Sequence, residues 1–297
     1  MNMTTKLNQQ DCSLSLIYMY PLIGIFSITL NVFAINIFSR IKFKNTIFFI
    51  YFRLLIILDT ISLIYIMTCK FMIVGQYKHL KDINLFWCKL SMISIYYIPA
   101  IKNHILIVIS IDRWLNISSK FNISVLIRKC SYQIIFCITI MLINLLIYID
   151  LFFSYINDDE SKCVLYDQKL LFWTDFITST LVSFILLVLF TSLIILTVFN
   201  KIRDVSSNLQ SNDEQTEINQ TITVITYNIL YLLIILPINN NQIVIEYDYN
   251  EVIKSNFQYL IEIFLVFLYT FIYANSFVFN LVVNPMFKNE LFKNLLY

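Results

Sequence analysis

The sequence predicts an all-α membrane protein, a seven-transmembrane helix bundle followed by a short amphipathic helix. Of its 297 residues, 59% are hydrophobic and 13% are charged. The apolar residues gather into long runs separated by short polar connections, at 14–38, 46–72, 88–114, 131–153, 171–199, 221–245 and 258–283. Each run exceeds the ~20 helical residues that cross a ~30 Å hydrocarbon layer. Seven such runs leave too little polar chain to cover them in water, so we expect lipid around them.

Little of the chain lies outside these runs, so we expect residues 1–297 to form one domain. The first run is too long for a removable signal peptide. After the seventh run, apolar residues at three- and four-residue spacings alternate with lysines. This pattern predicts a helix over 285–296 that lies on the inner membrane face.

The polar connections set the expected orientation. With the N-terminus extracellular and the C-terminus cytoplasmic, eleven Lys and Arg lie inside and eight outside, with inner clusters at 40–44 and 128–129. This bias agrees with the positive-inside rule and predicts a multi-pass protein of the plasma membrane. Asn2 then becomes a candidate for glycosylation. The net charge of +2 gives no reason to expect a nucleic-acid partner.

Two charged residues fall at the middle of their runs. Asp59 lies halfway along the second run, and Lys102 lies at nearly the same depth in the third, fourteen residues after Cys88. Intramembrane charges are costly and mark function by default, and a lysine this deep is too short to reach either surface. We expect an ion pair within a polar core that also holds Asn31 and Asn103. The alternative is that the two groups face different cavities, or that a neutral Lys102 stands alone.

The third run carries the most specific pattern. Cys88 opens it, and Asp112-Arg113 closes it, with Arg113 twenty-five residues after Cys88. Together with Asn31 and Asp59, this spacing resembles the rhodopsin-like (class A) family of G-protein-coupled receptors over nearly the whole chain. The stretches 43–46 and 51–53 are similar to invertebrate peptide receptors of the FMRFamide-receptor-like type.

The resemblance implies a receptor that binds an extracellular ligand and activates a heterotrimeric G protein. It implies that the Asp112–Arg113 pair restrains the resting state and that Arg113 is freed when the sixth span swings outward; the alternative is an ordinary arginine at a span end. The expected coupling and switch residues are Asp112, Arg113, Pro237, Asn280, Asn284 and Pro285. The chain departs from the family at Ile235, where a tryptophan is usual. The register of the seventh span stays open, between Asn280 without a proline and Asn284-Pro285.

The resemblance also implies two further features, one at the outer end of the bundle and one at its middle. One is a disulfide between Cys88 and Cys163 that tethers the second outer loop, the alternative being two free thiols. The other is a sodium site at Asp59. Because Lys102 stands where the family has a small polar sodium ligand, we expect its ammonium group to replace the ion.

Acidic residues near the outer ends of the spans suggest the class of ligand. They favour a basic neuropeptide through charge attraction, although each alone is also explained as a solvated loop charge; a different peptide or a small-molecule ligand is the alternative. The vestibule candidates are Asp150, Asp158, Asp159, Glu160, Asp175 and Glu262. Ile95 stands where amine receptors carry aspartate, and no lysine in the seventh run offers a retinal linkage.

Two other classes of function remain to be compared with a receptor. A small transporter or channel would use Asp59 and Lys102 as an intramembrane charge pair. An enzyme is not expected, because the chain has two histidines and no recognised catalytic or metal-binding motif. We therefore expect no cofactor and no metal.

Overall fold

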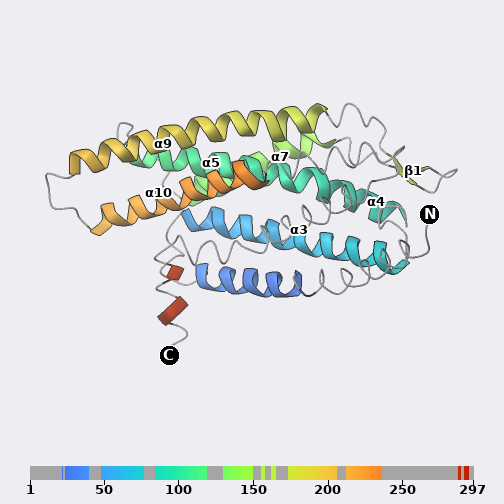
Figure 1. The fold of residues 1–297 in the computed structure, drawn as a ribbon. Coiled ribbons are helices and arrows are strands. Elements are labelled where there is room, and N and C mark those ends of the chain that lie inside the picture. Colours follow the sequence, from blue (N-terminus) through green and yellow to red (C-terminus); the bar gives the residue numbers. More distant parts are fainter. Residues whose placement is uncertain are drawn as a thin grey trace, which may run out of the picture.

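The computed structural model describes residues 22, 24–39, 48–76, 84–118, 130–149, 155–157, 162–164, 173–205, 212–235, 287–288 and 291–293. The seventh predicted span, 258–283, lies outside these residues. The described chain is almost entirely helical, and its long helices lie side by side along a common direction (Figure 1). Its helical class is therefore confirmed. One described helix, Trp173–Lys201 with 29 residues, is long and apolar enough to cross a membrane; Gly24–Phe38 and Ile135–Ile147 are shorter apolar helices.

The first two predicted spans are helical wherever they are described. Gly24–Phe38 forms one helix and α3 spans Phe48–Gln76. The two are joined near the end of the first helix, where the Arg53 guanidinium of α3 donates a hydrogen bond to the Phe38 carbonyl. A cation at this position also meets the negative end of the helix dipole.

The third predicted span is a continuous helical segment with a wider turn inside it. It consists of α4 (Leu85–Met92), η2 (Ile93–Tyr97) and α5 (Ile98–Ser118), where η denotes a π-helical stretch. The Asn84 side chain accepts a hydrogen bond from the Trp87 N–H and so caps the start of α4. Pro99 explains the wider turn: it has no N–H to donate, and its ring would clash with the carbonyl four residues earlier. Opening the preceding turn to π geometry relieves this conflict.

The fourth and fifth predicted spans flank a short hairpin. Helix α7 spans Cys130–Ile147, and the fifth span contains η4 (Phe176–Val182) and α9 (Ser183–Val205). Between them, β1 (Tyr155–Asn157) pairs antiparallel with β2 (Lys162–Val164), placing Ile156 opposite Cys163. This hairpin is a small departure from the expected all-α class.

The sixth predicted span begins earlier than expected. Helix α10 spans Asn212–Leu230 and continues as η5, Tyr231–Ile235, whereas the hydrophobic run begins at residue 221. The extra turns follow from Glu and Gln, which are good helix formers, and from acidic residues near the positive end of the helix dipole. Because α9 also continues to Val205, the connection between the fifth and sixth predicted spans is shorter than hydropathy suggests.

The third span lies at the centre of the described bundle. Helix α5 contacts α3, α7, α9 and α10, most extensively α9, and α4 contacts strand β1. Figure 1 shows the hairpin and α4 at one end of the molecule, and the end of α9 with the start of α10 at the other. We call these the hairpin end and the basic end, because Lys201, Arg203, Lys288 and Lys293 belong to the second.

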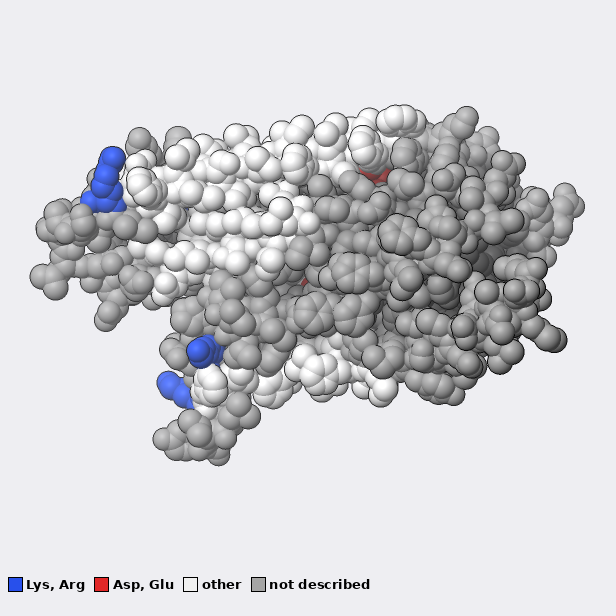
Figure 2. All heavy atoms as spheres, in the orientation of Figure 1, with Lys and Arg blue, Asp and Glu red and all other residues white. Residues whose placement is uncertain are grey.

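The described surface exposes many large apolar side chains, and the interior holds polar side chains among apolar ones. Large apolar side chains on α7 and α9 are exposed, among them Leu146, Leu196 and Phe199. Charged or amide side chains such as Asn31 and Asp59 are buried. Figure 2 shows a broad uncharged surface along the described middle of the bundle, with basic groups at one end.

The C-terminal segment is described at 287–288 and 291–293, all of them helical. Phe287 and Leu291, one helical turn apart, are buried, whereas Phe292 is exposed. The Phe287 ring packs on Phe38 with centroids 5.0 Å apart. The predicted amphipathic pattern therefore holds in these residues, although their apolar face packs on the bundle itself.

Candidate functional site: a polar core along the central helix

Three consecutive polar residues of α5 reach four neighbouring elements. The Lys102 ammonium forms an ion pair with the Asp59 carboxylate of α3, as expected from their depth. Asn103 Nδ2 donates to the Ser179 carbonyl at 2.9 Å and to its hydroxyl at 3.0 Å. The Tyr231 hydroxyl of η5 donates to Asn103 Oδ1. Successive helical residues point about 100° apart, so Lys102 and Asn103 face different neighbours.

His104 completes this layer on the side of α7. Its Nδ1 lies 3.0 Å from Asn144 Oδ1, and Asn144 Nδ2 donates to the Ile140 carbonyl of its own helix at 2.8 Å. A half-buried histidine with an amide partner is a satisfied core residue and needs no ligand to explain it.

The Lys102–Asp59 pair is almost fully removed from solvent, with 5% and 1% of the two side chains exposed. Attraction between buried charges is strong, but it must offset the cost of taking both out of water. Removing one partner alone therefore leaves an uncompensated charge. Asn31, the other predicted member of this core, is also fully buried.

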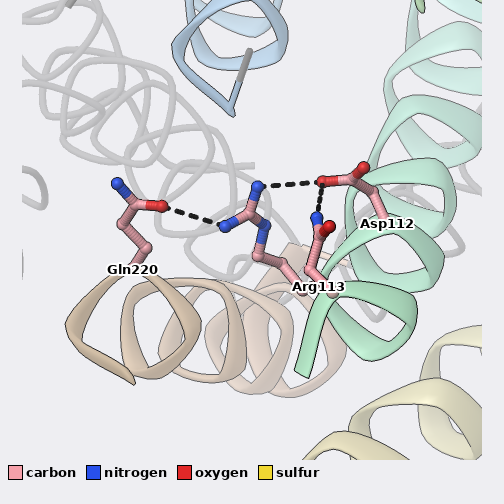
Figure 3. A network of polar contacts seen from close by, with 4 residues as sticks. Asp112, Arg113 and Gln220 are labelled. Atoms are coloured by element: carbon pink, nitrogen blue, oxygen red, sulfur yellow. Dashed lines mark hydrogen bonds and ion pairs between the residues drawn. The ribbon is translucent and has the colours of Figure 1, made fainter. Parts of the chain in front are cut away.

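A second network lies at the basic end, between α5 and α10 (Figure 3). Arg113 Nη2 donates to Asp112 Oδ2 at 2.9 Å, so the predicted ion pair is present. Arg113 Nη1 donates to Gln220 Oε1 at 2.9 Å, and Asn116 Nδ2 donates to Asp112 Oδ2 at 3.2 Å. Arg113 and Asp112 are buried. The guanidinium group therefore joins α5 to α10.

A third contact, which sequence analysis missed, lies between these two. Asn228 Nδ2 of α10 donates to Ser110 Oγ at 2.7 Å and to Thr191 Oγ1 at 2.9 Å. The available signal was an amide inside the apolar run 221–245, which is expensive in lipid unless it is paired. Gln220 was missed because it stands just before that run.

At the hairpin end the structure corrects the expected place of one vestibule residue. Asp175 is 4% exposed, and its Oδ1 accepts a hydrogen bond from the Tyr148 hydroxyl at 2.6 Å. It therefore ties the start of the fifth span to the end of the fourth and is not a solvated rim charge. An aspartate two residues after Trp173 looks interfacial in sequence, but Tyr148 and the helix packing cover it.

The predicted cysteine chemistry is partly visible. Cys88 is disulfide-bonded, which confirms that it is not a free thiol. Strand β2 holds Cys163 and pairs with β1, which contacts α4, but the Cys163 side chain lies outside the described atoms. Cys137 is a free, buried thiol.

The remaining predicted site residues lie outside the described part of the chain: Asn2, Asp150, Asp158, Asp159, Glu160, Pro237, Glu262, Asn280, Asn284 and Pro285. Within the described residues, no group of His, Cys, Asp and Glu could hold a metal ion. No protein-family model matches the chain, and no curated protein matches it significantly. The proposed function therefore rests on the geometry of the site.

Proposed function

We propose that the chain is a seven-transmembrane receptor of the rhodopsin-like kind that binds an extracellular ligand and activates a heterotrimeric G protein. The observation that carries this proposal is the Arg113 guanidinium, which is held between Asp112 and Gln220 at the basic end. A buried arginine with both partners in place is a contact that must break for α10 to move away from α5. A switch requires an element that can take two discrete arrangements, and a contact that is either made or broken can supply them.

The surface and its charges support a bilayer around the bundle. Exposed apolar side chains on α7, α9 and α10 would be a liability in water and are ordinary in lipid. The basic residues Lys201, Arg203, Lys288 and Lys293 share one end, which suits the cytoplasmic side. In this orientation the hairpin end faces outward, where a disulfide at Cys88 is chemically stable. Cys163 is the partner we propose.

The ligand we propose is a basic neuropeptide. Acidic residues in the predicted outer loops would raise its association rate in a salt-dependent way. Asp175 no longer counts toward this set, since it is buried in the helix packing. A ligand shifts the receptor only by the difference between its affinities for the two states.

A cell-based assay tests the receptor function. Cells expressing the chain should respond to members of an amidated-peptide library with a second-messenger signal, which an Arg113→Ala variant at equal surface level should lose. Gln220→Ala should raise the signal without ligand severalfold, because the resting contact loses one charge-assisted hydrogen bond. Thr226→Val is the matched control, since Thr226 Oγ1 donates to the Ile222 carbonyl of its own helix. Equal basal signals from Gln220→Ala and this control would argue against a restraining role for the Arg113–Gln220 contact.

A small transporter or channel is the second candidate, and the buried Lys102–Asp59 pair favours it. Intramembrane charge pairs are common in ion pathways. Proteoliposomes containing the purified chain separate the two functions, because only a transporter or channel would pass ions in the absence of a G protein. Flux that Lys102→Met abolishes would select this alternative.

A further inference from the structure

We propose that Asn228 is a positioning residue that holds the sixth helix in its resting place independently of Arg113 and Gln220. This inference rests on the proposed receptor function and names the part of the same switch that lies deeper in the bundle. It follows from how α10 and η5 meet the central helix.

The sixth helix makes polar contacts with α5 at three depths. Gln220 meets Arg113 at the basic end, Asn228 meets Ser110 in the middle, and Tyr231 meets Asn103 nearer the hairpin end. The three residues of the sixth helix are eight and three positions apart, so they share one face. Apolar neighbours such as Val224 are buried on the same side, so these contacts lie in a largely dry seam.

Asn228 differs from Gln220 and Tyr231 because its described contacts join three helices, α5, α9 and α10. Its amide nitrogen serves Ser110 of α5 and Thr191 of α9 at once, with the side chain fully buried. The Ser110 hydroxyl is fixed in turn by its own hydrogen bond to the Leu106 carbonyl at 2.8 Å. This bond orients the Ser110 oxygen as an acceptor toward α10.

The oxygen of the same amide group, Asn228 Oδ1, is buried and lacks a hydrogen-bond partner among the described residues. The N–H donors are satisfied when α10 is packed against α5 and α9. In an open arrangement, water entering the seam from the basic end would give this oxygen a partner. A buried polar atom without a partner is costly. The two hydrogen bonds made by Asn228 Nδ2 therefore stabilise the packed arrangement, whereas the unpaired Oδ1 destabilises it. As a result, Asn228 stabilises the packed position of α10 only moderately, so that the helix can still move away.

Removing one of the two hydrogen-bond acceptors of Asn228 tests its positioning role, because the change should raise the fraction of open molecules. Thr191→Val keeps the shape of the side chain and strands one buried N–H of Asn228 in the packed state alone. Stranding a buried donor should raise the ratio of open to packed molecules about tenfold. Ser110→Ala does the same from α5. Thr197→Val is the matched control on α9, since Thr197 Oγ1 donates to the Leu193 carbonyl of its own helix.

The measurement is a distance distribution between spin labels, carried by bio-orthogonal amino acids at the exposed positions Phe199 of α9 and Ile222 of α10. The full chain is studied in lipid nanodiscs without a G protein. A longer-distance population should grow in Thr191→Val and Ser110→Ala and stay unchanged in Thr197→Val. Unchanged distances in both test variants would overturn the proposal.

A double variant excludes a mere packing effect. In an Asn228→Leu background there is no amide to strand, so Thr191→Val should cause no further change; an equal change in that background would overturn the positioning role. Basal nucleotide exchange in membranes containing G proteins is measured in parallel. A shift in the label distances without a change in exchange would support the role of Asn228 and count against the receptor function.

Discussion

At the scale of single residues, the ion pair between Lys102 and Asp59 shows how depth alone can predict a contact. Neither side chain can reach water from the middle of its run, so each needs the other, and the structure brings them together. Neutral amides offer no such constraint. Gln220 and Asn228 can be satisfied by many partners, so their contacts with Arg113 and Ser110 follow from helix packing that the sequence does not reveal.

The pair yields a prediction about stability. Lys102→Ala should lower the free energy of unfolding by ~3–5 kcal/mol, because the Asp59 carboxylate remains buried without its counter-charge. The double variant Lys102→Met with Asp59→Leu should recover most of that loss, since an apolar pair of similar size carries no desolvation cost. Thermal melting in detergent, with surface expression in cells, measures both. Equal melting temperatures for Lys102→Ala and the unaltered chain would show that the charges do not depend on each other.

At the scale of elements, π-helical stretches occur within the third, fifth and sixth predicted spans, at η2, η4 and η5. Two of them supply polar contacts to α5, Ser179 from η4 and Tyr231 from η5. The Ser183 hydroxyl, at the start of α9, donates to the Thr178 carbonyl of η4 at 3.3 Å and helps to satisfy the looser backbone. π-helical turns are frequent at functional sites, and these three lie in the half of the bundle nearer the hairpin.

Sequence periodicity predicts that these helices exist, but it predicts their ends and their irregular turns less well. Apolar runs locate the helices, but they do not reveal that polar residues extend α10 back to Asn212. Pro99 does signal the irregular turn at η2, although a proline alone does not distinguish a kink from a π-helical turn. The β1–β2 hairpin escaped prediction because strands of three residues carry too little alternation to detect.

The C-terminal segment allows a prediction with an internal control. Phe287→Ala should cost ~3–5 kcal/mol, because the ring is fully buried beside Phe38 and its loss leaves a cavity. Phe292→Ala, at an exposed position five residues away, should change the melting temperature little in detergent. Comparable losses in the two variants would mean that the segment does not dock through Phe287.

At the scale of the whole molecule, the described surface exposes many large apolar side chains, and buried charges and amides lie inside among apolar core residues. That arrangement, with basic residues at one end (Figure 2), is the strongest physical reason to surround the bundle with lipid. The arrangement of seven spans remains a proposal, because the seventh lies outside the described residues. Its topology can be tested directly.

Epitope accessibility tests the proposed topology. A tag at the N-terminus should bind antibody on intact cells, and a tag at the C-terminus only after the plasma membrane is permeabilised. An odd number of spans requires the termini to lie on opposite sides. Simultaneous detection of both tags on intact cells would exclude seven spans and the receptor with them.

The Lys102–Asp59 pair has a consequence for how the protein is made. In the proposed seven-span topology, the second segment would leave the ribosome before the third, so its carboxylate would enter the translocon with no ammonium yet available. A charge at the centre of an inserting helix costs roughly 2.5–3.5 kcal/mol. We therefore expect the second and third segments to partition into the bilayer together, as a helical pair that has already neutralised itself.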